Sequence, residues 1–190
     1  MRLQRQVTYL SRDGVLFAAD AVLSARRAEW LVETACEIGP AVVRTDGMPS
    51  VAPAAEGAAA AWFLPLIPPE NASAGDGTPS IHSGMTVGRG RSRGRACFLP
   101  FVLILPRDDV ERRSPPFRRS LTVTERGRVV AADAAVAYRV QLGSRQWVFY
   151  RSLAAPANRA FLGCNFAGES LVGTFGKKGV TALLEVQMEG

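Results

Sequence analysis

The sequence predicts an all-β fold, an antiparallel β-sandwich of the jelly-roll or supersandwich kind, and three observations lead to it. Apolar and polar residues alternate along most of the chain, which is the period of a β-strand. About a dozen short apolar segments recur at a spacing of roughly 8–12 residues, each bounded by turn residues. The 18 glycines and 12 prolines are spread along the chain, which suits many turns.

The N-terminal segment predicts an antiparallel meander of three strands. Residues 3–10 alternate and form the first expected strand. Residues 11–14 end in Asp-Gly, which tolerates the positive φ of a tight hairpin turn. A second strand is expected over 15–23, a polar turn over 24–27, and a third strand over 28–38, where Trp, Val, Thr and Cys alternate.

The middle of the chain is less regular. A strand is expected over 61–66, followed by one long surface loop over 68–83 that is rich in small and polar residues. A stretch of glycines and arginines covers 85–95, and the most apolar strand of the chain follows over 96–105. Residues 112–119 are expected to be a basic connection that contains two prolines.

The C-terminal third predicts closely spaced strands separated by turns such as Arg-Gly, Gly-Ser and Lys-Lys-Gly. The expected strands cover residues 120–125, 129–133, 135–142, 146–153, 161–166, 169–175 and 181–187.

The composition predicts a globular protein with a hydrophobic core. The chain has 190 residues, 47% of them hydrophobic, and we expect one domain over residues 1–190. No apolar run approaches the roughly 20 residues that span a bilayer, and the N-terminus lacks the apolar segment of a signal peptide. The chain as it stands is expected to stay in the cytosol. Its strand pattern starts without a lead-in, which is also typical of the C-terminal part of a longer protein.

Four arginines are the main candidates for ligand binding. The net charge of +6 permits binding to nucleic acid, an anionic polysaccharide or a phospholipid surface. Arg89, Arg91, Arg93 and Arg95 alternate with small residues, and in a strand this spacing places them on one face. Arginine binds sulfate, carboxylate and phosphate groups through two parallel hydrogen bonds, so the row predicts a polyanion site. The alternative is a solvated basic loop.

Other polar residues carry weaker hypotheses. Asp20 lies in an apolar strand, where a carboxylate needs a partner, and we interpret it as a buried structural residue paired with an arginine such as Arg5. His82 is the one histidine, and a lone histidine in a loop is weak support for catalysis. The three cysteines are widely spaced, so we expect free thiols, no metal site and no cofactor.

Several aromatic residues could stack on a sugar ring, although in a sandwich such residues more often belong to the core. They are Trp30, Trp62, Tyr138, Trp147, Phe149 and Tyr150. Arg145, Arg151 and Arg159 lie near three of them in sequence, and they either flank a groove or point outward on alternate positions.

Residues 3–22, LQRQVTYLSRDGVLFAADAV, resemble the start of the C-terminal β-domain of heparinase II/III-like proteins. Residues 147–153, WVFYRSL, and 158–163, NRAFLG, also resemble the closing strands of such a protein. The resemblance implies a β-sandwich that closes one side of a cleft for anionic polysaccharide. It also implies that catalysis by β-elimination belongs to a helical toroid, which this chain lacks. Within a secreted protein of this kind the domain would be periplasmic or extracellular.

The resemblance carries over to one residue. Some family members hold a structural metal in this domain with histidines and an aspartate, and Asp20 matches the aspartate. No histidine lies near Asp20 in the sequence, so Asp20 is expected to be structural and metal-free.

Three functions are compatible with these patterns. The first is a non-catalytic accessory β-sandwich of a heparinase II/III-like protein that contacts an acidic polysaccharide. Its partner would be a helical domain or a second chain. The second is a structural or protein-interaction domain without a glycan role. A nucleic-acid binder is less favoured, because no recognition helix, RNA-binding signature or alternation of aromatic and basic residues is present. No membrane partner is expected.

Overall fold

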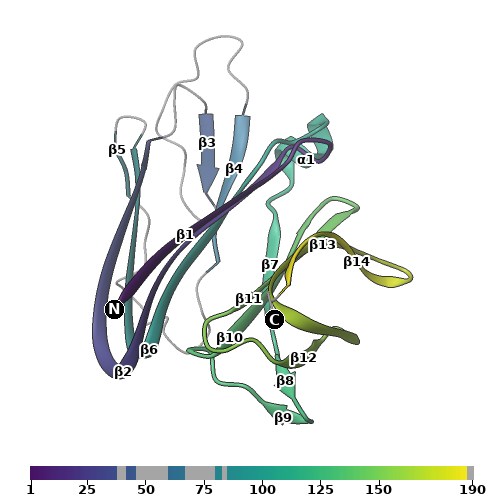
Figure 1. Ribbon diagram of the computed structural model, residues 1–190. Helices are drawn as coiled ribbons and strands as arrows, with labels where there is room; N and C mark the ends of the chain where they lie inside the picture. The colour runs from purple at the N-terminus through teal and green to yellow at the C-terminus, as the bar shows by residue number, and fades with distance from the viewer. Residues whose placement is uncertain (38–41, 46–59, 67–79, 83–84, 188–190) are drawn as a thin grey trace. The chain divides into compact units, whose positions relative to one another are not determined.

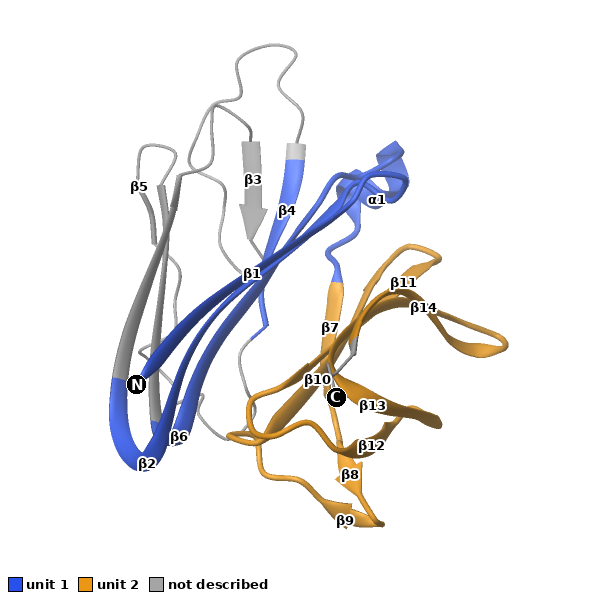
Figure 2. Cartoon of the chain, viewed as in Figure 1, with its two compact units in different colours: residues 1–67, 71–116 blue, residues 68–70, 117–190 orange. Residues whose placement is uncertain are grey.

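The fold is described by a computed structural model (Figure 1). The described backbone covers residues 1–37, 42–45, 60–66, 80–82 and 85–187, and side chains are described over 1–30, 61–66 and 93–186. The chain divides into two compact units (Figure 2): unit 1 contains residues 1–67 and 71–116, and unit 2 contains residues 68–70 and 117–190. Each unit is described by itself, and the expectation of one domain stays a prediction.

Unit 1 is built on a six-stranded sheet in the order β1-β2-β6-β4-β3, with β5 paired to β6. Its strands are antiparallel except for the parallel pair β3–β4. The bounds are β1 Arg2–Leu10, β2 Val15–Glu37, β3 Val42–Thr45, β4 Ala60–Pro65, β5 Ser80–His82 and β6 Met85–Ile104. This sheet confirms the predicted fold class for the first half of the chain.

The two central strands of this sheet are far longer than the sequence predicts. The expected turn over 24–27 is wrong, because β2 continues through these residues as a bulge. Leu23 pairs with Ala96 and Ala28 pairs with Gly94, so residues 24–27 face the single residue Arg95. The glycine- and arginine-rich stretch likewise continues into β6, whereas the sequence separated it from the strand that follows.

Strands β2 and β6 supply much of the core of unit 1, and over residues 17–22 and 96–98 consecutive side chains are buried, so both faces of these strands are covered there. Val15, Phe17, Val102 and Ile104 are buried, and each pair is two positions apart on its strand. The hairpin turn between β1 and β2 lies where the Asp-Gly pair predicts it, since Gly14 has φ +61°. The Gly14 carbonyl oxygen also accepts a hydrogen bond from the Leu105 amide at 2.8 Å, which ties the turn to the end of β6.

A short helix, α1 (Asp109–Arg113), lies near the end of unit 1, where a helix was not predicted. The connection expected over 112–119 is therefore wrong at both ends, since α1 includes residues 112–113 and a strand begins at Phe117. Asp108 caps it, because its carboxylate accepts a hydrogen bond from the Glu111 amide at 2.8 Å. The buried Glu111 carboxylate accepts from the Arg107 amide at 2.8 Å, and the Glu111 carbonyl accepts from the Trp62 indole at 3.0 Å. Asp108 and Glu111 have the spacing of a capping box, a signal that could have revealed the helix.

Unit 2 is an antiparallel sheet in the order β7-β10-β11-β13-β12-β8-β9, with β14 paired to β13. It confirms the predicted fold class for the second half of the chain. The bounds are β7 Phe117–Leu121, β8 Thr124–Glu125, β9 Arg128–Val129, β10 Ala135–Leu142, β11 Arg145–Ser152, β12 Asn158–Phe161, β13 Cys164–Gly176 and β14 Gly179–Gln187.

Most predicted elements of unit 2 are present, but several have different boundaries. The strand expected over 129–133 is wrong beyond Val129, where β9 ends, because residues 132–134 form a turn. The strand expected over 169–175 is part of the longer β13.

The strand expected over 161–166 is wrong, because Leu162 and Gly163 have φ +48° and +72° and form the turn between β12 and β13. The strand expected over 120–125 is divided between β7 and β8, with the buried Val123 between them. The errors at 120–125, 129–133 and 161–166 arise where apolar residues lie next to a turn or a break in a strand.

An aromatic cluster forms the centre of unit 2. The Tyr150 ring stacks on Phe161 with ring centroids 4.9 Å apart, and Phe166 meets it edge-on at 5.5 Å. Aliphatic residues of β10, β11 and β13 surround these rings, including the buried Val148 and Leu171. The cluster joins β11, β12 and β13, so it fixes how these strands lie against one another.

Candidate functional site

The structure describes the arginine row of β6 in part. The Arg93 side chain is exposed, in agreement with a role at the surface. Arg95 continues the row two positions along β6 and is also exposed. Arg89 and Arg91 lie in β6 at register positions opposite Glu33 and Leu31 of β2, but their side chains lie outside the described residues. The described part of the row therefore contains two arginines.

The β2 bulge brings further arginines to this row. Arg26 and Arg27 lie in the bulge that faces Arg95, and both side chains are exposed. Arg2, also exposed, begins β1 and pairs with Leu23, the last residue before the bulge. We call these five residues, Arg2, Arg26, Arg27, Arg93 and Arg95, the bulge cluster. The cluster lies where the N-terminus meets the curved part of β2 (Figure 1).

The charge of Arg93 is only weakly compensated by its acidic neighbour. Glu29 lies opposite Arg93, and the Arg93 Nε and Glu29 Oε1 atoms are 4.0 Å apart. The two side chains are 86% and 80% exposed, and an ion pair this open to water contributes little attraction. The Arg93 guanidinium can therefore exchange this contact for an anion from solution.

Trp30 is close to the bulge cluster along the strand, but it pairs with Ser92, so alternation places it on the other face of the sheet from Arg93 and Arg95. Its indole Nε1 donates a hydrogen bond of 2.9 Å to the carbonyl oxygen of Gly94, between Arg93 and Arg95. The side chain is half-buried, so part of the ring is open to solvent. The other aromatic candidates from the sequence, Trp62, Tyr138, Trp147, Phe149 and Tyr150, are all buried in the core.

Asp20 is a buried carboxylate held by a surface arginine. Its two oxygens accept hydrogen bonds from Arg5 Nε at 2.7 Å and Arg5 Nη2 at 2.8 Å. The residues face each other across β1 and β2, which makes this a cross-strand pair. Arg5 is the arginine that the sequence suggests as a partner, and the bidentate geometry satisfies the carboxylate that Asp20 buries.

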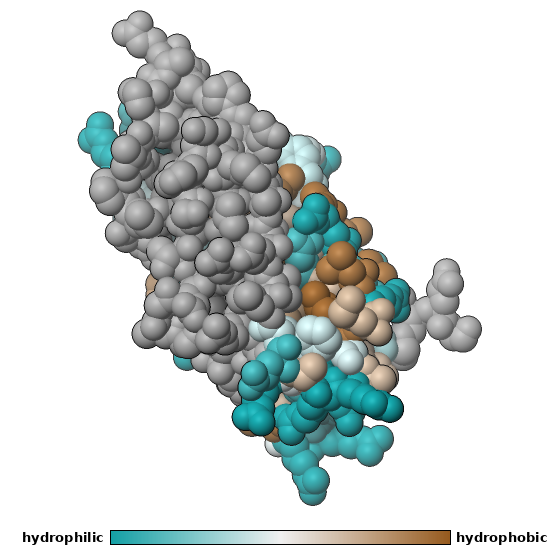
Figure 3. Space-filling view, turned by 90° about the vertical axis from the view of Figure 1, so that its left-hand side faces the viewer, coloured by the Kyte–Doolittle hydropathy of each residue, from teal (hydrophilic) through white to brown (hydrophobic). Residues whose placement is uncertain are grey.

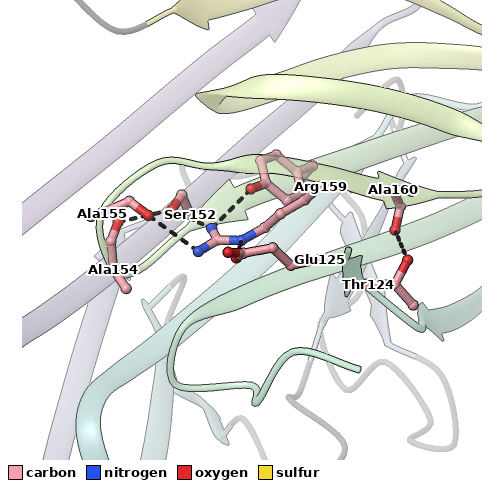
Figure 4. A network of polar contacts seen from close by, with 8 residues as sticks. Thr124, Glu125, Ser152, Ala154, Ala155, Arg159 and Ala160 are labelled. Carbon is pink, nitrogen blue, oxygen red and sulfur yellow. Dashed lines mark hydrogen bonds and ion pairs between the residues drawn. The ribbon is translucent and has the colours of Figure 1, made fainter. Parts of the chain in front are cut away.

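The arginines near Trp147 and Tyr150 in sequence do not form a surface groove. Arg159 is 4% exposed and lies inside unit 2 (Figure 4). Its guanidinium donates to Glu125 Oε2 at 3.2 Å, Tyr150 Oη at 3.2 Å, Ser152 Oγ at 2.7 Å and the Ala155 carbonyl at 3.1 Å. These acceptors come from β8, β11 and the loop before β12, so Arg159 joins three segments.

The two other arginines are also held within unit 2. The buried Arg151 forms an ion pair of 2.5 Å with Glu169 on β13. The Arg145 guanidinium lies over the Trp147 ring, 4.9 Å from its centroid. Sequence alternation could not distinguish these structural roles from a ligand-binding one.

The residues considered for metal binding and catalysis do not form a site within the described structure. The long loop expected over 68–83 is wrong at residues 80–82, which form β5, and the rest of that range lies outside the described residues. His82 ends β5, and its side chain also lies outside the described residues. No group of three or more His, Cys, Asp or Glu residues there is placed to bind a metal ion. Burial raises the pKa of the Cys97 thiol to about 11. Burial and the nearby Glu185 carboxylate raise the pKa of Cys164, so both thiols are protonated and weakly nucleophilic at neutral pH.

Comparisons with protein-family models, with curated proteins and with solved structures find no match to this chain. Within the described residues, no helix is long and apolar enough to cross a membrane.

Proposed function

We propose that this chain is a polyanion-binding β-domain whose ligand is an acidic polysaccharide. It would act as a non-catalytic accessory domain of the kind that heparinase II/III-like proteins carry. The observation that carries the proposal is the bulge cluster, in which five exposed arginines gather from three strands of one sheet.

The chemistry of the cluster suits a chain of anionic groups. Each guanidinium presents a planar fork of donors that matches a sulfate or carboxylate. Alternate residues of one strand are about 6.6 Å apart, so Arg93 and Arg95 on one face of β6 can contact successive anionic groups. Arg2 shares the register position of Leu23 and Ala96, on the other face, and contributes to the cluster from the end of β1.

An acidic polysaccharide is favoured over nucleic acid for two reasons. The described aromatic side chains are mostly buried, whereas single-stranded nucleic acids are bound by exposed aromatic rings that stack on successive bases. The one described helix, α1, has five residues and is too short to read a DNA groove. The resemblance of residues 3–22 to heparinase II/III-like proteins points to the same ligand class.

The ligand class is tested by the affinity of the 190-residue chain for three probes: heparin, uncharged dextran and duplex DNA. The proposal predicts binding to heparin that weakens with salt, no binding to dextran, and weaker binding to DNA than to heparin at equal salt. Equal affinity for heparin and DNA would mean a general electrostatic surface and would contradict the polysaccharide assignment. Absence of heparin binding would leave a structural or protein-interaction domain as the function.

A further inference from the structure

Two arginines of unit 2 lie directly opposite each other on neighbouring strands. Arg119 of β7 pairs with Arg139 of β10 in the antiparallel register of these strands. Directly opposed residues share one face of a sheet, and two like charges in such a pair repel each other. An anion bound between the two guanidinium groups would offset this repulsion.

Neither of these arginines forms an ion pair within the described part of the chain. Arg119 is exposed. Arg139 Nη2 lies 3.5 Å from Gln141 Oε1, at the outer limit of a hydrogen bond, and Arg139 Nε is buried without an acceptor. The described buried arginines of unit 2, Arg151 and Arg159, each pair with a glutamate instead. The donors of Arg119 and Arg139 therefore remain for a ligand.

The arginine pair lies on the face of the sheet that carries the aromatic cluster. Ala137, two positions before Arg139 on β10, is part of that cluster. The Arg139 guanidinium lies over the Phe175 ring, 4.9 Å from its centroid. This contact holds the guanidinium in place and leaves its positive charge uncompensated by a carboxylate.

Two further side chains of this face suit a sugar. Gln146 of β11 lies opposite Gln141, and its Oε1 atom is buried without a hydrogen-bond donor, which a hydroxyl group can supply. Phe117 of β7 also lies opposite Gln141 and is 55% exposed, so its ring offers an apolar surface to the C–H groups of a sugar ring. Apolar and hydrophilic residues likewise lie next to each other on the face of the molecule in Figure 3.

We propose that this face of unit 2 binds one uronate, a sugar that carries a carboxylate, at Arg119 and Arg139. The carboxylate lies between the two guanidinium groups, a ring hydroxyl donates to Gln146 Oε1, and the sugar ring packs on Phe117. Arg139 and Gln146 are half-buried as residues, so a change of side-chain rotamer brings their buried atoms to the ligand. The site goes beyond the bulge cluster and does not depend on it, because all of its residues belong to unit 2.

An NMR titration that follows the signals of Arg119 and Arg139 compares four probes: D-glucuronate, D-glucose, acetate and inorganic phosphate. A ligand of this size is expected to bind with a Kd of about 1 mM, which NMR measures well. We expect no binding of glucose, which lacks the charge. Acetate and phosphate lack the sugar ring and should bind at least about tenfold more weakly than glucuronate.

Three variants assign the binding to the proposed residues. Arg119→Gln removes one guanidinium at an exposed position and should raise the Kd for glucuronate at least about tenfold. Arg118→Gln makes the same change one residue away, on the other face of β7, and should leave the Kd within about twofold of the wild type. Gln146→Met removes the acceptor of the hydroxyl and should raise the Kd for glucuronate about fivefold, while the Kd for acetate stays unchanged. Circular dichroism checks that each variant is folded.

A wild-type chain that does not bind glucuronate at up to about 50 mM would overturn the proposal. An equal loss in Arg118→Gln and Arg119→Gln would do so as well, because it would mean that net charge alone attracts the ligand. Phosphate that binds as tightly as glucuronate would contradict a site for a sugar. Each of these outcomes leaves the polysaccharide proposal for the bulge cluster standing, since that cluster belongs to unit 1.

Discussion

Replacing Arg159 by methionine should destabilise unit 2 strongly, although the residue is charged and the change conserves much of the side-chain length. Methionine removes the donors that serve Tyr150, Ser152, Ala155 and Glu125. The neutral acceptors would remain in a site that is closed to water, because Arg159 itself is 4% exposed. An acceptor that stays buried without a donor lowers the unfolding free energy, because it is shielded from water and has no hydrogen bond in its place.

The expected loss is about 3 kcal/mol of unfolding free energy. Removal of one partner of a buried ion pair costs about 3–5 kcal/mol. The lower end applies here, because the Glu125 side chain is 39% exposed and water can hydrate its carboxylate when Arg159 is gone. Arg159→Lys keeps the positive charge but makes fewer of the four contacts, and it should lose about 2 kcal/mol.

Urea unfolding measures the loss as a lower midpoint, and amide hydrogen exchange of β11 and β12 assigns it to unit 2. Arg126→Gln, on an exposed turn of the same unit, is the matched control and should change stability by less than about 0.5 kcal/mol. If Arg159→Met lowered the unfolding free energy by no more than this control does, the network in Figure 4 would not be holding unit 2 together.

Three further predictions concern buried polar groups. Tyr138→Phe should raise the unfolding free energy, measured in urea, by about 1 kcal/mol, because the phenol is buried without a hydrogen-bond partner in the described structure. A lower urea midpoint in the variant would mean that the hydroxyl makes a stabilising contact. Arg5→Gln should cost about 2 kcal/mol in the same assay by leaving the Asp20 carboxylate underpaired, and an unchanged midpoint would contradict the bidentate pair. The unfolding free energy of the wild type should fall from pH 9 towards pH 11 more steeply than that of Cys97→Ala. The reason is that the buried Cys97 thiol, with a pKa of about 11, keeps its proton in the folded state at a pH where the unfolded thiol has lost it. Parallel profiles of unfolding free energy against pH would contradict the raised pKa of Cys97.

The local features of the fold could be read from the sequence, whereas the long strands could not. The turns at Gly14 and at Arg126-Gly127 have the positive φ values that their sequences favour. Residues 24–27 carry an equally polar turn signal, but pairing with β6 on both sides keeps them within β2 as a bulge. Strand pairing across the chain decides between turn and bulge, and no short window of sequence contains that information.

The same limit applies to the candidate site. Alternation identifies Arg93 and Arg95 as surface residues of a strand. Arg2, Arg26 and Arg27 join them only through the register of β1, β2 and β6, which the sequence does not display. The sequence does not distinguish Trp30 from the other aromatic candidates, whereas in the structure Trp30 is half-exposed and the others are buried.

The buried arginines were the least predictable residues. The burial of Arg159 depends on acceptors from three separate segments, and the residue itself lies in a polar stretch that resembles a loop. A charged side chain is expected at the surface unless its partners are known. Its role depends on the arrangement of the strands that carry Glu125, Tyr150 and Ser152.

The most direct test of the proposed function compares two variants that lose the same charge from different places. One variant replaces Arg26, Arg27, Arg93 and Arg95 of the bulge cluster by glutamine. The other makes the same change at four exposed basic residues of unit 2, Arg126, Arg128, Lys177 and Lys178. The affinity of each for a heparin oligosaccharide would be measured calorimetrically at physiological salt. We predict a loss of at least about tenfold for the first variant and a change within about twofold for the second. An equal loss in both would mean that net charge alone drives binding, and it would contradict a polysaccharide site at the bulge cluster.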